Sequence, residues 1–189
     1  MSIRPMLEVE TDAGVIVVEV HTDTAPLTAA YVLDLVERSI YDGSSFYRST
    51  TLGRERKPLI QGGPWSDVIC GVSDVGPRIA MLEQFETTQT SGSNHVAGAI
   101  SLARDLMRTG FALPEWFICL DAYPDLDQGG PIEPDDQGFP VFGTVVAGLD
   151  VVEAIANGST GGRSTVELLT GQVLDAPVSI RSITVVDGS

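Results

Sequence analysis

The feature that most limits the fold of this chain is a series of short β-rich segments separated by turn residues. The 189 residues include 20 glycines and 11 prolines. These two residue types favour turns, because glycine adopts positive φ angles and proline fixes φ. Many short strands with regularly placed turns are typical of β-barrels and β-sandwiches. The predicted strands lie at residues 7–10, 15–20, 45–48, 59–61, 97–103, 116–120, 141–145 and 179–186.

Two other segments carry helical signals. Thr24 precedes Pro26, and a threonine before a proline in the first turn favours a helix start, so we expect Thr24 to cap this helix. A second helix is predicted at 149–156, and Asn157-Gly158 ends it. The sequence therefore predicts a β-barrel or β-sandwich capped by two helices. The first helix is predicted to have one apolar face, formed at helical spacing by Leu27, Tyr31, Leu35 and Val36.

Charge and length exclude several classes of protein. Eleven Lys and Arg residues oppose 26 Asp and Glu residues, which gives a net charge of −15. A field of this sign repels phosphate groups, so we expect no nucleic-acid and no membrane partner. No apolar stretch approaches the roughly 20 residues that cross a bilayer, and the first residues show no apolar signal core. We expect a single domain over residues 1–189, cytoplasmic, or periplasmic if a signal peptide has been removed.

The sequence also lacks the motifs of most bond-breaking and cofactor-dependent chemistry. It contains no Gly-x-x-x-x-Gly-Lys-Ser/Thr loop, no Gly-x-Gly-x-x-Gly before a helix and no Gly-x-Ser-x-Gly. Its only histidines are His21 and His95, and its two cysteines, Cys70 and Cys119, have no partner at metal-binding spacing. We therefore expect no metal, no cofactor and no hydrolytic triad.

Three blocks of sequence, in order along the chain, carry the most specific signal. They are Ser-Phe-Tyr-Arg at 45–48 with Leu-Ile-Gln-Gly-Gly at 59–63, then His-Val-Ala-Gly-Ala-Ile-Ser-Leu-Ala-Arg at 95–104 with Trp-Phe-Ile at 116–118, and finally Leu-Asp at 126–127 with Val-Phe-Gly-Thr-Val-Val-Ala-Gly-Leu-Asp-Val-Val at 141–152. Together they resemble the cyclophilin family of peptidyl-prolyl cis–trans isomerases, and the resemblance extends from about Val9 to Ile155. It implies a mainly β fold, a closed eight-stranded antiparallel barrel capped by two α-helices, with a proline pocket on its outer face.

The resemblance also implies how this chain would isomerise an Xaa–Pro bond. The amide rotates over a barrier of roughly 18–20 kcal/mol, so a catalyst must bind the twisted amide better than either planar isomer. The twisted prolyl nitrogen gains a lone pair, which a fixed guanidinium can stabilise. Arg48 matches the catalytic arginine of the family, and Gln61 matches the glutamine that binds substrate backbone or orients that arginine. Phe117 matches the phenylalanine at the base of the proline pocket.

Five further residues match substrate-binding positions of the family. Leu59 and Leu126 correspond to apolar residues of the pocket, and without the resemblance both would be ordinary core residues. Ala103 and Arg104 lie where the strand backbone of the family bonds to the peptide, although Ala103 could equally be plain barrel packing. Phe139 stands at a position where the family usually has a histidine, and bacterial members of the family often have an aromatic residue there.

The sequence departs from the family pattern at several positions near this site. Twelve residues separate Arg48 from Gln61, about five more than is usual in the family. Pro58 replaces an aromatic residue, and Asp125 stands where many cyclophilins have a tryptophan, which weakens any expectation of tight cyclosporin binding. Glu115 stands where a glutamine is usual, and it could pair with Arg48.

We predict a peptidyl-prolyl cis–trans isomerase that acts, as a monomer, on proline-containing peptides or unfolded protein segments and assists folding. The alternative is a catalytically weak cyclophilin-like module that binds proline-containing peptides or proteins, with the loop at 121–140 as its recognition surface. Faster exchange of a short proline peptide that depends on Arg48 would favour the enzyme. Peptide binding without faster exchange would favour the binding module.

Overall fold

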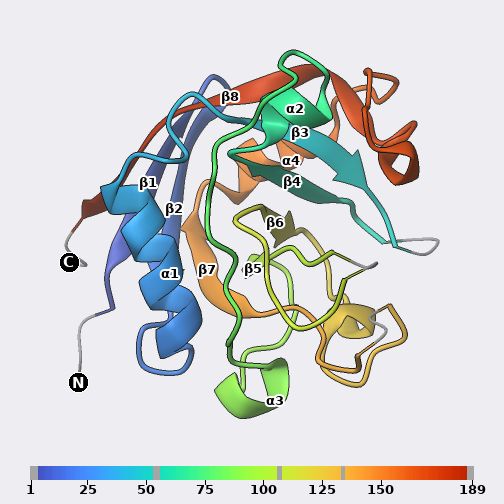
Figure 1. The fold of residues 1–189 in the computed structure, drawn as a ribbon. Helices are drawn as coiled ribbons and strands as arrows, with labels where there is room; N and C mark the ends of the chain where they lie inside the picture. Colours follow the sequence, from blue (N-terminus) through green and yellow to red (C-terminus); the bar gives the residue numbers. More distant parts are fainter. Residues whose placement is uncertain (1–3, 53–55, 106–107, 133–134, 187–189) are drawn as a thin grey trace.

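The computed structural model describes residues 4–52, 56–105, 108–132 and 135–186. Within these residues, eight antiparallel strands close into one barrel in the order β1-β2-β7-β5-β6-β4-β3-β8 (Figure 1). The closed eight-stranded barrel predicted above is therefore confirmed, although its last strand begins before the predicted start at residue 179. The strands span Met6–Thr11 (β1), Gly14–Val20 (β2), Ser45–Thr50 (β3), Leu59–Gly63 (β4), Ala99–Leu102 (β5), Trp116–Cys119 (β6), Val141–Ala147 (β7) and Val173–Val186 (β8).

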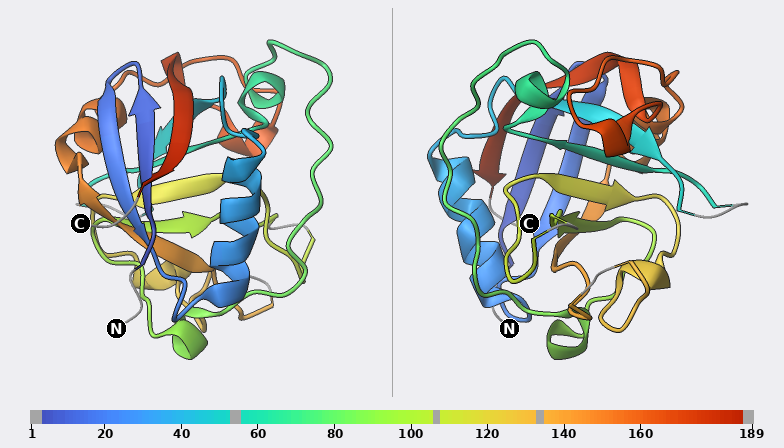
Figure 2. Two further views of the ribbon diagram at one scale, coloured as in Figure 1. Left: turned by 90° about the vertical axis from the view of Figure 1, so that its left-hand side faces the viewer. Right: turned by 45° about the vertical axis from the view of Figure 1, so that its right-hand side comes forward.

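Two longer helices cover opposite sides of the barrel (Figure 2). Helix α1 (Pro26–Glu37) packs against β7 and β8, and α4 (Leu149–Ala156) packs against β2, β3 and β4. The described chain also contains two single-turn helices, α2 (Ser66–Ile69) and α3 (Thr88–Ser91), and two 3-10 turns, η1 (Pro124–Leu126) and η2 (Glu167–Leu169). Segments this short carry no helical periodicity, so the sequence pattern did not predict them. Among the described helices, none has the length and hydropathy that spanning a bilayer requires.

Helix α1 begins at Pro26, but its N-terminal cap is not the predicted one. Thr24 Oγ1 is buried and has no hydrogen-bond partner in the described chain, so the predicted threonine cap is wrong. Instead, the Glu86 carboxylate accepts from the N–H groups of Leu27 at 2.8 Å and Thr28 at 3.0 Å. A carboxylate at this end of a helix also interacts favourably with the helix dipole. The buried face is shifted from the predicted one, because Leu27 is exposed and the core side is formed by Thr28, Ala29, Val32, Leu35 and Val36.

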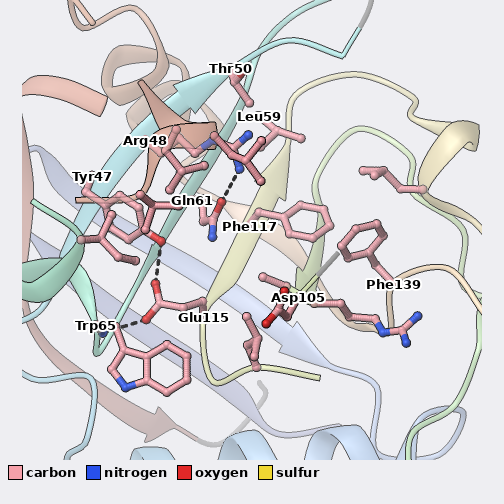
Figure 3. A pocket seen from close by; sticks show the side chains of 18 of the residues that line it. Tyr47, Arg48, Thr50, Leu59, Gln61, Trp65, Asp105, Glu115, Phe117 and Phe139 are labelled. Carbon is pink, nitrogen blue, oxygen red and sulfur yellow. Dashed lines mark hydrogen bonds between the residues drawn. The ribbon is translucent and has the colours of Figure 1, made fainter. Parts of the chain in front are cut away.

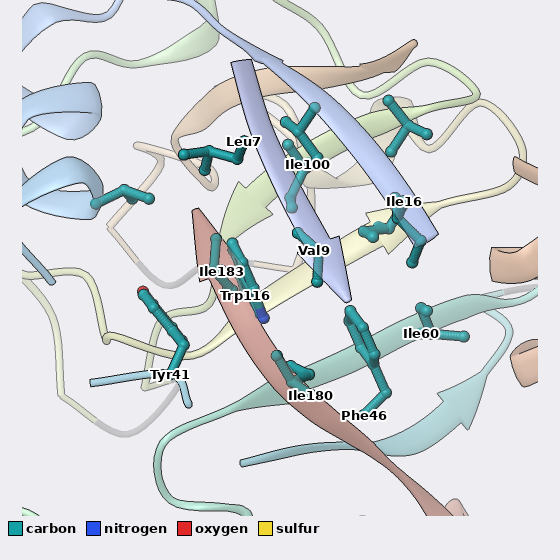
Figure 4. Packing of buried hydrophobic residues seen from close by; sticks show 14 of the residues in the cluster. Leu7, Val9, Ile16, Tyr41, Phe46, Ile60, Ile100, Trp116, Ile180 and Ile183 are labelled. Carbon is teal, nitrogen blue, oxygen red and sulfur yellow. The ribbon is translucent and has the colours of Figure 1, made fainter. Parts of the chain in front are cut away.

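The barrel interior is packed with aliphatic and aromatic side chains (Figure 4). The Trp116 ring stacks on Tyr41, with centroids 4.5 Å apart, and on Phe142 at 6.0 Å. Phe46 lies on the same cluster, and Ile60 reaches it from β4. These side chains are almost completely buried, so the interior of the barrel is a packed core and the site must lie elsewhere.

A second apolar cluster lies on the outer face of the same strands. Side chains alternate between the two faces of a strand, so β4 sends Ile60 into the barrel and Leu59 outward. In the same way β6 sends Ile118 inward and Phe117 outward. Strands β4 and β6 therefore carry a site on the outside of the barrel. The cluster is completed by Ala103, Cys119, Tyr123, Leu126 and Phe139.

Candidate active site

Strands β3, β4 and β6 place the three predicted catalytic residues side by side. Arg48 is opposite Gln61 in the β3–β4 register, and Gln61 is opposite Phe117 in the β4–β6 register. The β3 register shifts between Phe46 and Arg48, so Tyr47 is an extra residue at that point. A bulge of this kind redirects side chains. Phe46 points into the barrel, while Tyr47 and Arg48 both line the outer cleft.

The cleft on this face has a volume of about 490 Å³ (Figure 3). It brings together every residue that the sequence assigned to the site. The roles of these residues in catalysis and binding stay predictions, whereas their common location is now a structural fact. The eight residues are Arg48, Leu59, Gln61, Ala103, Arg104, Phe117, Leu126 and Phe139.

Two glutamine side chains hold the guanidinium of Arg48. Nη1 donates to Gln61 Oε1 at 2.6 Å, and Nε and Nη2 donate to Gln172 Oε1 at 2.9 and 2.6 Å. A guanidinium has five N–H groups, so one on each terminal nitrogen stays unpaired within the described chain. Burial lowers the pKa of Arg48, but both acceptors are neutral amides and leave its positive charge uncompensated.

Gln172 is the site residue that the sequence reasoning missed. It lies 124 residues after Arg48 in the chain and immediately before β8. Its backbone carbonyl accepts from the Ser49 N–H at 3.0 Å, and its Nε2 donates to the Leu168 carbonyl at 3.0 Å. No signal in the sequence pointed to it, because Gln172 reaches Arg48 only through the pairing of Val173 with Arg48 between β8 and β3.

Glu115 lines the cleft but does not pair with Arg48, so the suggested ion pair is wrong. Its Oε1 accepts from the Trp65 N–H at 2.7 Å, and its Oε2 accepts from the Tyr47 hydroxyl at 2.9 Å. The side chain is almost completely buried, at 1% exposure. Burial raises the pKa of this carboxyl from 4.5 to about 7, and the two hydrogen bonds oppose the rise only in part. The wall of the cleft therefore contains a carboxyl group that titrates near neutral pH.

The apolar end of the cleft is formed by two aromatic rings with a histidine behind them. Phe117 and Phe139 meet edge to face with centroids 5.5 Å apart, and His95 stacks on Phe117 at 5.7 Å. The His95 ring is fixed on both sides, by Asp127 Oδ1 at 2.7 Å and by Ser101 Oγ at 3.2 Å. A ring held in this way supports Phe117 from behind and keeps the apolar floor in place.

Ala103 and Arg104 line the cleft, but most of their hydrogen-bonding groups serve the fold. The Ala103 N–H donates to the Glu115 carbonyl at 2.7 Å, and the role of Ala103 in peptide binding stays a prediction. The Ala103 carbonyl accepts from the Leu113 N–H at 2.8 Å. The Arg104 side chain donates to both oxygens of Asp135 and to the Gly138 carbonyl at 2.9 Å. Arg104 thus anchors the loop at 121–140 against β5.

The sequence matches the family described as cyclophilin type peptidyl-prolyl cis-trans isomerase/CLD over residues 6–185. The chain belongs to this family. It is 32% identical over 155 residues to peptidyl-prolyl cis-trans isomerase-like 1 of Rhizopus delemar, covering 81% of both chains. It is 29% identical to a peptidyl-prolyl cis-trans isomerase of Streptomyces antibioticus, covering 82% of this chain and 85% of that one. It is 26% identical to one from Acinetobacter baylyi, covering 80% of this chain and 72% of that one.

The fold of this cyclophilin is also found among solved structures. A cyclophilin-type isomerase of Cryptosporidium parvum, solved in the presence of the dipeptide Ala-Pro, superposes with a TM-score of 0.70. The comparison covers 97% of this chain and 99% of that chain at 14% identity, so it shows a shared fold. The family predicted from the three sequence blocks is confirmed, and with it the isomerase class of the enzyme.

Proposed function

We propose that this cyclophilin isomerises Xaa–Pro bonds in flexible peptide segments with Arg48 as the catalytic residue. The observation that carries the proposal is the placement of the Arg48 guanidinium. Two neutral amide oxygens fix it beside an apolar pocket, and two of its N–H groups have no partner in the part of the chain that the structure describes. Phe117, Leu59 and Leu126 supply the apolar pocket in which a proline ring would be shielded from water.

The arrangement favours the twisted amide over the planar one. In either planar isomer the nitrogen lone pair is delocalised into the carbonyl, so the nitrogen is a poor acceptor. When the bond twists, the lone pair localises and can accept a hydrogen bond from Arg48. An interaction made only in the twisted state lowers the barrier without tightening substrate binding. The half-buried position of Arg48 strengthens its hydrogen bond to the twisted nitrogen, because water screens the charge of the guanidinium less there.

The substrate class follows from the shape and lining of the cleft. A volume of about 490 Å³ falls within the range of ordinary small-ligand sites, roughly 300–1,000 Å³, so it can hold a short peptide segment. The Cryptosporidium parvum relative crystallised in the presence of Ala-Pro supports a proline-containing ligand. Action as a cytoplasmic monomer that assists folding stays a prediction from the sequence.

Two-dimensional exchange NMR of an Ala-Pro-Phe peptide tests the proposal, with wild type and Arg48→Ala compared at equal concentrations. We expect Arg48→Ala to lower kcat/KM on the order of 100-fold, as for loss of a transition-state hydrogen-bond donor elsewhere. Arg181→Ala is the matched control, because Arg181 is 63% exposed and pairs with Asp12 outside the cleft. Equal catalysis by wild type and Arg48→Ala would refute the proposed role of Arg48. Peptide binding without faster exchange in wild type would instead support the binding module.

A further inference from the structure

The cleft continues past Arg48 to a second end that the isomerisation chemistry does not use. Figure 3 shows Phe117 and Phe139 on one side of Gln61 and the Trp65 ring on the other. Beyond Trp65, this second end is lined by Ile69 of α2 and by residues in and beside η2. We call it the α2–η2 end, and its lining side chains are Trp65, Ile69, Val166, Leu168 and Leu169.

Hydrogen bonds hold the two walls of the α2–η2 end together and tie them to the catalytic residue. The Thr165 N–H donates to the Ile69 carbonyl at 2.8 Å, and the Thr165 hydroxyl donates to the Val68 carbonyl at 2.9 Å. On the other side, Gln172 donates to the Leu168 carbonyl and accepts from Arg48. The α2–η2 end is therefore a formed part of the cleft, adjacent to the guanidinium.

The side chains of the α2–η2 end include apolar surface that faces water. Leu168 is 66% exposed and Val166 is 39% exposed. Of the large hydrophobic residues exposed in the described chain, these two alone line the cleft. Exposed apolar surface at the rim of a ligand cleft is favourable only when a ligand covers it. One carboxyl group on the cleft wall, Glu115, already accepts two hydrogen bonds and is turned toward Tyr47 and Trp65.

We infer that the α2–η2 end binds a bulky apolar side chain of the same peptide whose proline occupies the Phe117 end. The inference rests on the proposed function, because it takes the proline pocket as the anchor of the peptide. The occupant is part of the same peptide because the cleft runs without interruption from the proline pocket past Arg48 to the α2–η2 end. A side chain a few residues from the proline reaches this end, since extended chain advances roughly 3.3 Å per residue. Leu168 and Val166 would then set a preference for leucine or phenylalanine near the proline.

Peptide series test this subsite. In each peptide, the Ala-Pro unit is flanked by glycine, leucine, phenylalanine or lysine, placed one or two residues before or after it. Exchange NMR gives kcat/KM, and resonance shifts on titration give Kd. We expect leucine or phenylalanine at one of these positions to improve kcat/KM over glycine about tenfold, mainly through KM. Leu168→Ser should reduce this leucine-to-glycine ratio of kcat/KM to about twofold, because it removes apolar surface that the peptide side chain would cover.

Leu27→Ser is the matched control, because Leu27 is 50% exposed on α1 and lies outside the cleft. It should leave the leucine-to-glycine ratio at its wild-type value. Equal values for glycine, leucine and phenylalanine would overturn the inference, and so would a preference for lysine or a ratio that Leu168→Ser does not change. Failure of the proposed function is separate, because it appears as undiminished turnover by Arg48→Ala. If no peptide is turned over, the ratio of Kd between the glycine peptide and the leucine or phenylalanine peptides tests the subsite without any turnover.

Discussion

The buried carboxyl of Glu115 makes a strong prediction about stability. Its pKa is raised from 4.5 to about 7 in the folded chain because the group is buried. Glu115→Gln replaces it with a neutral group of the same shape. The amide oxygen can still accept from the Trp65 N–H, and the amide nitrogen can donate to the Tyr47 hydroxyl, which rotates to accept. The substitution therefore removes the ionisation and keeps both contacts, with the direction of the Tyr47 hydrogen bond reversed.

The expected effect depends on pH in a defined direction. Below pH 4.5 the carboxyl is protonated in both folded and unfolded chains, so its ionisation has no effect on stability. Between pH 4.5 and 7 the unfolded chain ionises while the folded chain keeps its proton, so the free energy of unfolding falls as pH rises. Each pKa unit corresponds to 1.36 kcal/mol, so the rise from 4.5 to about 7 destabilises the wild type by about 3 kcal/mol above pH 7.

Urea unfolding of wild type and Glu115→Gln at pH 4, 5, 6, 7 and 8 measures this difference. We expect the two proteins to have similar stability at pH 4. At pH 8 the variant should be more stable by about 3 kcal/mol, equivalent to roughly 6–12 °C in Tm for a chain of this size. Glu153→Gln on α4 is the control, because Glu153 is half exposed and pairs with Lys57 at the surface, where ion pairs contribute little. A constant difference between wild type and Glu115→Gln from pH 4 to 8 would refute the reasoning.

Three further predictions test other parts of the structure. Gln172→Ala removes the acceptor of two Arg48 N–H groups and should lower kcat about tenfold with little change in KM. Exchange NMR measures both constants, and an unchanged kcat would show that Gln172 does not position the Arg48 guanidinium. Gln172→Glu keeps the acceptor but neutralises the guanidinium charge, so it should fail to restore kcat. Glu86→Ala leaves the N-terminus of α1 without its acceptor and should lower the free energy of unfolding by about 1–2 kcal/mol in urea titration, whereas wild-type stability would show that the cap contributes nothing. Phe139→Ala opens the floor beside Phe117 and should raise Kd for Ala-Pro peptides, as measured by NMR titration; wild-type affinity would place the proline elsewhere.

Local sequence patterns located most of the framework. All eight strands were placed, because β-rich runs and the turn residues between them are properties of neighbouring residues. Helix α4 was predicted at 149–156 and spans Leu149–Ala156, since its apolar face and its Asn157-Gly158 end are both local. The site residues came from the resemblance of the three blocks to a family, and the structure places all eight in one cleft.

The sequence by itself therefore determined which segments form strands and which family the chain resembles. Only the tertiary structure decided which distant groups meet. Closure of the barrel pairs β3 with β8 and brings Gln172 to Arg48 across 124 residues. Likewise, Glu86 caps α1, and Glu115 turns to Tyr47 and Trp65 and not to Arg48. The physical reason is that a local pattern encodes whether a side chain is buried, whereas its hydrogen-bond partner is set by the segment packed opposite it.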